Sequence, residues 1–432
     1  MKPELRLNNR LLPILAALLI VLQLIMPYKG WVILLVALGG AWLICWLWAL
    51  SLARGLAFTR EMRFGWAQVG DRLEERFTLT NDGPAPAPWI EITDHTTLPG
   101  AHASRVTSAG GRDSLRWYVE AVCSRRGVFT LGPTTLRTGD PFGIYTVTLQ
   151  DPATSTLMVM PPIVPLPVIE VSPGGRAGEG RPRANALERT VSAAGVRDYL
   201  PGDSLHSIHW PTSARRDSLF VRLFDSTPAG DWWIFLDMDW KAQAGHGPDS
   251  TDEHGVIIAA SLADRGLAAG KAVGLVAHSD QLLWLPPQAG EGQRWEILRA
   301  LALVARGARP LSELLARARP SFRQLASVII ITPAVDGSWL EAILPLLQRG
   351  VIPTVLLLDT ISFGKRTAPE QLKATIGMLT ELGVAHYVIT RDLLDQPEVR
   401  PGHQGQWDWL TSPHGKAISK GPRRDLTWKA LS

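Results

Sequence analysis

The sequence predicts a membrane-anchored α+β multidomain protein with three consecutive parts. Two nearly uncharged apolar runs near the N-terminus indicate a transmembrane helical hairpin. Short alternating runs punctuated by turn residues, up to about residue 167, indicate a small β-sandwich. From residue 231 onward, continuous apolar runs alternate with helical periods, which predicts a doubly wound α/β domain. With 432 residues, the chain has room for two or three domains.

The apolar runs cover residues 11–27 and 31–50, with Tyr28-Lys29-Gly30 between them. Each is about long enough to cross a hydrocarbon core of roughly 30 Å, the first only just. A signal peptide is the alternative for the first run, because basic residues precede it. No small-residue cleavage site follows, and the second run begins at once. We therefore predict a two-helix transmembrane anchor at residues 1–55, with the lipid bilayer as its partner.

The basic residues around the anchor predict its orientation. Lys29 alone lies in the turn, whereas both outer flanks are basic, with Lys2, Arg6 and Arg10 before the runs and Arg54, Arg60 and Arg63 after them. The positive-inside rule then places the soluble domains in the cytoplasm, below a multi-pass plasma membrane protein. The formal net charge of +4 fits a membrane surface better than a nucleic-acid partner. With only Cys45 and Cys123, no disulfide framework is expected.

Residues 56–171 are expected to form the β-sandwich-like domain. Its expected strands are 72–80, 89–94, 114–122, 128–131, 134–138 and 144–149. No His, Cys or carboxylate cluster there has catalytic or ligand spacing, so a structural or docking role is expected. Residues 172–195 are rich in Gly, Arg and Pro and are expected to be a flexible linker.

Residues 196–400 are expected to hold the α/β domain, and residues 401–432 a basic tail without firm structure. The expected strands are 232–236, 272–278, 327–332, 354–358 and 385–389, with a short hairpin at 281–284. The expected helices are 253–267, 292–305, 338–349 and 369–382. Runs such as Val328-Ile329-Ile330-Ile331 are typical of strands buried on both faces of a largely parallel sheet.

The stretch from residue 196 to 222 gathers many opposite charges around the expected apolar anchors Tyr199, Ile208 and Trp210. This segment resembles the signature of the bacterial domain of unknown function 58 family. The matching positions are Arg197, Tyr199, Gly202, Asp203, Ile208, Trp210, Ala214 and Arg215. His206 and Pro211 stand where the family usually has Arg and Lys. These matching residues are candidates for a partner-binding or structural signature.

The resemblance implies a bacterial inner-membrane protein that works with a MoxR-type AAA ATPase. It also implies a von Willebrand factor A-like domain in the α/β part. In such domains a turn of the pattern Asp-x-Ser-x-Ser binds a metal, and here only Asp237 matches, because Asp239 and Lys241 replace the two serines. A hard divalent cation needs several oxygen ligands, and Lys241 adds a competing charge. We expect no metal and no cofactor, with Asp237, Asp239 and Asp336 as the weak candidates.

We therefore predict a non-enzymatic membrane-anchored adaptor or scaffold for the remodelling or maturation of a client. The first alternative is a metal-dependent ligand-binding domain that uses Asp237 and Asp239. A weaker alternative is a hydrolase built on His206 and His209 near Asp203, with Ser204, Ser207 or Ser213 as nucleophile. The absence of G-x-S-x-G, Walker A and G-x-G-x-x-G patterns disfavours common hydrolases, NTPases and dinucleotide-binding proteins.

Overall fold

The computed structural model divides into two compact units, residues 1–162 with 401–432, and residues 163–400. It describes residues 2–8, 10–167, 169–172, 193–198, 210–216, 218–224, 231–318, 326–365, 368–395, 408–411, 417–420 and 429–430. The protein is a mixed α/β protein with several sheets and an apolar N-terminal helix.

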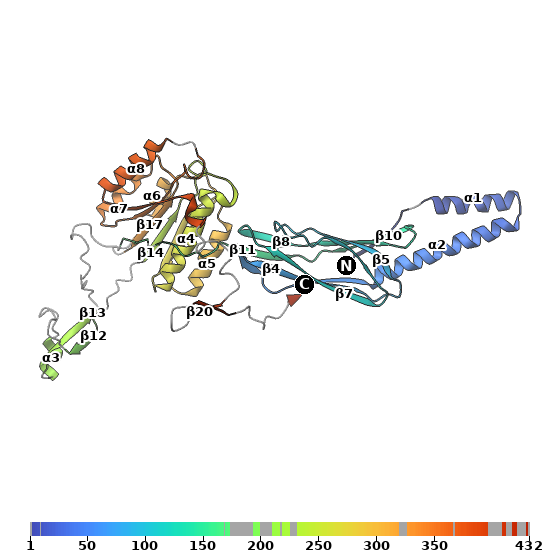
Figure 1. Ribbon diagram of the computed structural model, residues 1–432, viewed down its shortest axis with the longest axis horizontal. Helices are drawn as coiled ribbons and strands as arrows, with labels where there is room; N and C mark the ends of the chain where they lie inside the picture. The colour runs from blue at the N-terminus through green and yellow to red at the C-terminus, as the bar shows by residue number, and fades with distance from the viewer. Residues whose placement is uncertain are drawn as a thin grey trace. The chain divides into compact units, whose positions relative to one another are not determined.

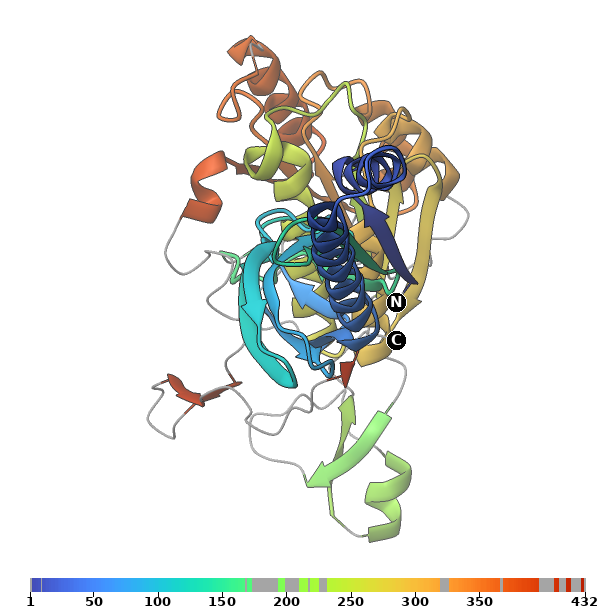
Figure 2. The ribbon, with the colours of Figure 1, turned by 90° about the vertical axis from the view of Figure 1, so that its right-hand side faces the viewer.

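The first unit begins with β1 (Lys2–Leu7), α1 (Leu11–Ile25) and α2 (Lys29–Gly55). The two helices lie side by side (Figures 1 and 2). Both predicted apolar runs are therefore helical, and α2 continues past its expected end at Leu50. Among the described residues, α2 is the one helix long and apolar enough to cross a membrane, and α1 is shorter. Strand β1 is missing from the prediction; it pairs antiparallel with a later strand of the same unit.

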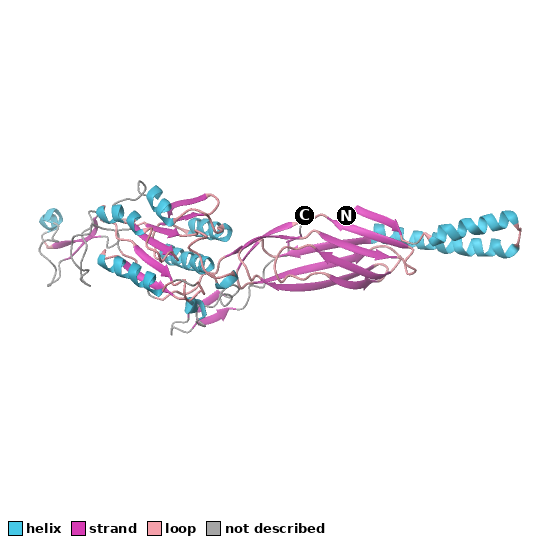
Figure 3. Cartoon of the chain, turned by 90° about the horizontal axis from the view of Figure 1, so that it is seen from above, coloured by secondary structure: helices cyan, strands magenta, loops and turns pink. Residues whose placement is uncertain are grey.

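The strands of the first unit form a sandwich of two main sheets with a smaller third sheet (Figure 3). One main sheet has the order β1-β10-β9-β5-β6, and the other has the order β22-β2-β4-β7. Their strands are β2 (Leu56–Met62), β4 (Arg72–Asn81), β5 (Ala87–Asp94), β6 (Arg105–Ala109), β7 (Asp113–Val122), β9 (Thr134–Gly139), β10 (Tyr145–Asp151) and β22 (Lys429–Ala430). The third sheet joins β3 (Trp66–Gln68), β11 (Ser155–Met160) and β8 (Gly127–Leu131).

Alternation along each strand builds the core between the two main sheets. On β4 every second residue is buried, including Phe77 and Leu79. They pack in one cluster with Ile90 and Val147 of the opposite sheet. Period-two patterning places such residues on one face, as expected for a sandwich. The six strands predicted from this pattern are confirmed within a residue or two at their ends, whereas β2, β3, β6 and β11 were missed.

The last part of α2 belongs to this same core. Cys45, Ala49 and Leu52 lie on one side of the helix and are buried in the cluster that the two main sheets share. Trp42 Nε1 donates a hydrogen bond of 2.6 Å to Tyr145 Oη, and Trp48 Nε1 donates one of 2.9 Å to the Pro86 carbonyl. The helix is thus fixed to the sandwich from Trp42 onward.

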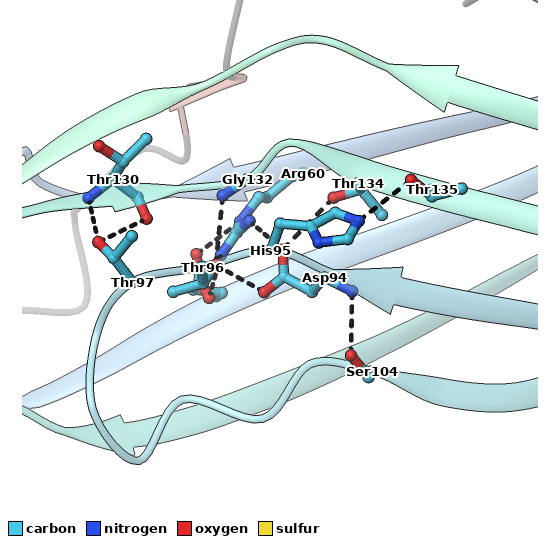
Figure 4. A network of polar contacts seen from close by, with 11 residues as sticks. Arg60, Asp94, His95, Thr96, Thr97, Ser104, Thr130, Gly132, Thr134 and Thr135 are labelled. Atoms are coloured by element: carbon cyan, nitrogen blue, oxygen red, sulfur yellow. Dashed lines mark hydrogen bonds and ion pairs between the residues drawn. The ribbon is translucent and has the colours of Figure 1, made fainter.

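A buried ion network interrupts the apolar core of the sandwich (Figure 4). The Arg60 guanidinium on β2 makes two bonds to Glu75 of β4, Nε to Oε1 at 2.7 Å and Nη2 to Oε2 at 2.8 Å. It also reaches Asp94 Oδ1 at 2.9 Å and Thr96 Oγ1 at 3.0 Å. Burial raises the pKa of the Glu75 carboxyl, and the bonds to Arg60 oppose that rise. Since both carboxylates are buried, they depend on this one cation.

We expect the substitution Arg60→Met to destabilise the sandwich by about 3–5 kcal/mol, because it leaves buried charges without their partner. Hydrogen exchange of the β2 and β4 amides in the full chain measures this loss. The matched control is Arg137→Met, whose pair with Glu91 spans 3.8 Å at half-exposed side chains. It should cost at most about 1 kcal/mol. Equal effects of the two substitutions would contradict the assigned role of the network.

The second unit is built on a six-stranded sheet of order β16-β15-β14-β17-β18-β19. The strands are β14 (Trp232–Leu236), β15 (Val273–His278), β16 (Leu282–Gln288), β17 (Ser327–Thr332), β18 (Thr354–Leu358) and β19 (Ala385–Ile389). All neighbours pair in parallel except the edge strand β16, which is antiparallel to β15. The five predicted strands are confirmed, and the expected hairpin residues fall in and before β16.

Helices cover both faces of this sheet. Trp233, Phe235 and Val328 face a core that contains residues of α6 (Leu311–Ala318), α7 (Leu344–Gln348) and α8 (Pro369–Glu381). On the other face lies α4 (Thr251–Ala268), with α5 (Glu291–Leu303) beside it. A Cβ at Gly255 of α4 would lie 3.1 Å from Leu236 Cδ1 and 3.7 Å from Ile331 Cγ2, so the glycine permits this close approach.

Three expectations need correction here, and one helix was not predicted. The helix expected at 338–349 is a short 3₁₀ turn, Leu340–Ala342, followed by α7, because Pro345 lies at the start of α7. Helix α6 was missed.

Residues 163–171, expected in the sandwich domain, belong to the second unit. There the Val164 N–H donates to Ser261 Oγ, and Arg265 Nη2 donates to the Ile169 carbonyl. The tail, expected to lack structure, contributes β20 (Asp408–Thr411), β21 (Ala417–Lys420) and β22.

Candidate functional site at the carboxyl edge of the sheet

Asp237 follows β14 directly, at the carboxyl end of the strand where the sheet order reverses. In chain order the six strands run 3-2-1-4-5-6, so β14 and β17 are the neighbours whose connections leave in opposite directions. In open α/β sheets, ligands bind in the crevice outside such a switch point. The side chain of Asp237 is 4% exposed, so the strand carries a carboxylate into the protein at this position.

Both oxygens of the Asp237 carboxylate accept hydrogen bonds from the protein. Thr332 Oγ1, at the end of β17, donates to Oδ2 at 2.6 Å, and the Asp239 N–H donates to Oδ1 at 3.0 Å. In the next turn, the Lys241 N–H donates to Asp239 Oδ1 at 3.1 Å. These two successive side-chain turns fix the loop after β14 and tie it to the neighbouring strand.

Burial raises the pKa of Asp237 to about 6. The hydrogen bonds from Thr332 and from the Asp239 N–H oppose this rise, while the nearby charges of Asp239 and Asp336 add to it. The Asp237 carboxyl group therefore changes between its neutral and its charged form within the ordinary pH range.

A pocket of about 250 Å³ opens at this edge of the sheet. Its lining combines acidic, basic and hydroxyl side chains with the ring of Trp339. The polar residues that line it are Asp237, Asp239, Lys241, Ser312, Asp336, Ser338, Lys365 and Gln371. Asp336 Oδ1 accepts bonds from the Ser338 N–H at 3.3 Å and from Ser338 Oγ at 3.1 Å. All three candidate carboxylates from the sequence therefore line one pocket.

Lys365 is the main cation that the sequence analysis missed. Its Nζ donates to the carbonyls of Lys241 at 2.8 Å and Ala242 at 2.9 Å, within the loop that follows Asp237. Gln243 supports the same loop, because its Nε2 donates to the Asp237 carbonyl at 2.9 Å. Lys365 lies more than a hundred residues from the loop that it contacts, so only the order of the strands in the sheet could have indicated these bonds.

The pocket is a poor fit for a divalent cation. Among the residues that the structure describes, no group of three or more His, Cys, Asp or Glu side chains could hold a metal ion. Lys241 and Lys365 both line the pocket and would repel a cation. Thr332 Oγ1 donates to Asp237 and accepts from the Ala334 N–H, so this hydroxyl serves the protein.

The signature segment forms a separate small element in the same unit. Arg197 lies in β12 (Ala193–Asp198), which pairs antiparallel with β13 (Phe220–Phe224), and the first residues of β12 fall in the expected linker. Trp210, Ala214 and Arg215 lie on α3 (Trp210–Arg216). The other four signature positions, Tyr199, Gly202, Asp203 and Ile208, lie outside the described residues.

Trp210 differs from its expected role as an apolar anchor, since its side chain is 64% exposed. Ala214 and Arg215 are also exposed. Ser213, a candidate nucleophile, is buried, and its Oγ accepts a bond of 2.9 Å from the Phe220 N–H. The other residues of the hydrolase alternative, His206, His209, Ser204 and Ser207, lie outside the described residues.

The fold and the site define a class of protein. It combines an apolar N-terminal helix, a β-sandwich and an α/β unit with a pocket of mixed charge at the switch point of its sheet. Residues 195–359 of the chain match the sequence model of the family described as protein of unknown function DUF58. This range includes the signature segment, the loop of Asp237 and the end of β18.

A relative and two solved structures are similar to the chain. Uncharacterized protein YeaD of Bacillus subtilis (strain 168) is 28% identical over 316 residues, which cover 70% of this chain and 76% of that protein. The CARDB domain of the PF1109 protein from Pyrococcus furiosus, solved in complex with di-metal ions, is 11% identical with a TM-score of 0.18. That match covers 24% of this chain and 90% of that domain. Proximal thread matrix protein 1 from the mussel byssus is 15% identical with a TM-score of 0.27, and the match covers 38% of this chain and 44% of that one.

The raised pKa of Asp237 predicts a specific pH dependence of stability. Between pH values of about 4 and 6 the native state holds a proton that the unfolded chain has released, so lowering the pH through about 6 stabilises the native state. Asp237→Asn removes this contribution. Its thermal midpoint should exceed that of the unmodified chain at pH 8, and the difference should shrink as the pH falls below about 6.

Thermal unfolding of the full chain in detergent, measured across this pH range, tests the prediction. The exposed Asp280 provides the control, since Asp280→Asn should change the midpoint little and equally at every pH. A difference between Asp237→Asn and the unmodified chain that does not vary with pH would show that Asp237 keeps its charge throughout.

Proposed function

We propose that this protein is a membrane-anchored adaptor without catalytic activity of its own. In this proposal α1 and α2 form a helical hairpin in the inner membrane, and the soluble units lie in the cytoplasm. The α/β unit is von Willebrand factor A-like and binds a partner protein at the pocket around Asp237. The family resemblance suggests a MoxR-type AAA ATPase as that partner, in the remodelling or maturation of a client.

The anchor is supported by the composition and exposure of the first helices. No charged residue lies between Lys29 and Arg54, and large apolar side chains such as Leu24, Ile33 and Val36 are mostly exposed. Because β1 and β2 both belong to the sandwich, the chain leaves that unit and returns to it through the two helices. This connection supports placing both ends of the hairpin on the same side of the membrane.

The adaptor role is supported chiefly by one observation, the polar pocket at the switch point. The described residues that line it include neither His nor Cys, and the Ser338 hydroxyl bonds to Asp336. The Asp237 carboxylate is occupied by two internal donors. Charged side chains and an exposed pocket suit recognition of a polar group on a partner, whereas a nucleophile with its base is not evident among them.

The von Willebrand factor A-like assignment is supported by the strand order, with one antiparallel edge, and by the place of Asp237. The turn departs from the metal-binding pattern at Asp239 and Lys241, and the pocket adds Lys365. The arrangement therefore favours a domain of this fold that binds its partner at the carboxyl edge of the sheet and holds no metal there.

We expect Asp336→Ala to weaken capture of the purified MoxR-type ATPase by the full chain in lipid nanodiscs. Loss of one charge-assisted contact at a protein interface costs about 1.5–3 kcal/mol, roughly a tenfold to hundredfold loss of affinity. The matched control is Glu296→Ala, which removes an exposed carboxylate from α5, outside the pocket. Binding that is equal for both variants and the unmodified chain would place the contact elsewhere, and no binding by any of them would contradict the partnership.

Calorimetry with divalent cations distinguishes the adaptor from the metal-dependent alternative. Under the adaptor proposal we expect no saturable binding of Mg²⁺ or Mn²⁺ by the unmodified chain at millimolar concentration. Lys241→Ser should create or strengthen such binding, because it removes a competing charge and restores a hydroxyl of the Asp-x-Ser-x-Ser pattern. Adding Asp237→Ala to that variant should abolish it. Saturable binding by the unmodified chain, lost with Asp237→Ala alone, would favour the metal-dependent function.

A further inference from the structure

The parts of α1 and α2 that extend beyond the sandwich are too short to span a bilayer by themselves. From Lys29 to Trp42, where α2 first bonds to the sandwich, the helix rises only about 20 Å, and α1 is about 22 Å long. The hydrocarbon core of a typical bilayer is about 30 Å thick. If the membrane surface lay at Trp42, the helices would stop roughly 8–10 Å short of the far side.

The apolar surface of α2 does not stop at Trp42. Leu43, Ile44 and Leu47 lie on the stretch that is fixed to the sandwich, yet each is about half exposed. The buried side of this stretch, with Cys45 and Ala49, faces the core, so the exposed side is directed away from it. Extending the membrane contact to Leu47 lengthens the apolar part of the helix to about 27 Å, close to a full span.

The end of the sandwich beside this stretch carries a large apolar side chain. Phe142 is 77% exposed in the turn between β9 and β10. That turn is held by Asp140, whose Oδ2 accepts from the Phe142 N–H at 2.9 Å, and it leads directly to Tyr145, the partner of Trp42. Phe142 therefore lies at the same end of the sandwich as the exposed residues of α2.

Tryptophan side chains at this level support the same placement. Trp42 and Trp48 direct their indole N–H groups to Tyr145 and Pro86 of the sandwich, and Trp46 is 40% exposed. Trp and Tyr are enriched where a protein crosses from the hydrocarbon to the headgroup region. The region of α2 from Trp42 to Trp48 thus has the composition of an interface.

We infer that the end of the β-sandwich is itself seated in the bilayer surface, with Phe142 inserted at the boundary between headgroups and acyl chains beside Ile44 and Leu47. This inference rests on the proposed anchor and extends it. In this arrangement the sandwich itself contacts the membrane. Its β9–β10 turn adds apolar surface at the level where the two helices alone do not cover the full thickness of the hydrocarbon core. The ligand of this surface is the phospholipid bilayer.

Depth measurements on the full chain in vesicles test the inference. Single cysteines that carry an environment-sensitive nitrobenzoxadiazole dye replace Phe142, Leu24 of α1, or Val122. The native Cys45 and Cys123 are buried, so labelling follows the introduced site. Val122 is 53% exposed at the end of β7 paired with Arg72, about 30 Å from the end paired with Asn81 beside α2. The vesicles contain phosphatidylcholine, a minor share of phosphatidylglycerol, and a lipid with a shallow nitroxide.

We expect the dye at position 142 to emit at shorter wavelength than at position 122, to be quenched by the nitroxide lipid, and to be shielded from aqueous iodide. The dye at position 24 should also be in lipid.

If position 24 is in lipid while position 142 behaves like position 122, the inference is wrong and the anchor stands. If none of the three is in lipid, both the inference and the anchor fail. If position 122 is quenched as strongly as position 142, the sandwich lies flat on the membrane and the end-on placement is wrong.

Discussion

The buried carboxylate of Asp237 constrains the carboxyl edge of the sheet in the α/β unit. It lies where the first strand of the sheet ends, and it is bonded to the end of the neighbouring strand through Thr332. An ionisable group so placed costs free energy unless donors surround it, and here Thr332 and the Asp239 N–H supply them. The bond from the Asp239 N–H folds the loop after β14 back onto Asp237, and the same loop presents the carbonyls that bind Lys365.

The first unit is constrained by a helix that meets two environments. One side of α2 near Cys45 and Ala49 must pack into the sandwich, while the other side, at Ile44 and Leu47, remains apolar and exposed. Small residues on the packed side allow the helix to lie close to the strands. A soluble helix would carry polar residues on its outer side. The packed side joins α2 to the sandwich in one unit, and the exposed apolar side is what the proposed membrane anchor would cover with lipid.

Much of the element order could be predicted because burial leaves a periodic pattern. The run from Val328 to Ile331 is buried on both faces, and its unbroken apolar character predicted β17 correctly. The alternation of β4 predicted that strand, but the same pattern hid its most unusual feature, because Glu75 and Arg60 occupy core positions as charged residues. Nothing local shows that two such residues fifteen positions apart meet on adjacent strands.

The site was predictable in part, because its carboxylates follow predicted strands. Asp237, Asp239 and Asp336 follow strand ends, and the carboxyl ends of parallel strands meet at one edge. The contributions of Thr332 and Lys365 depend on which strands become neighbours, which the order of the chain does not reveal. Trp210 shows the opposite error, since an aromatic residue in a charged segment was expected to be an anchor and is mostly exposed.

The central claim is that the carboxyl edge of this sheet is a protein-docking surface of a membrane-bound adaptor. Photo-crosslinking in intact cells tests it most directly, with a benzophenone amino acid at Gln371, which lines the pocket, or at Glu296 on α5. We expect an adduct with the MoxR-type ATPase from position 371 and none from position 296. The same adduct from both positions, or from position 296 alone, would contradict a docking surface at this edge.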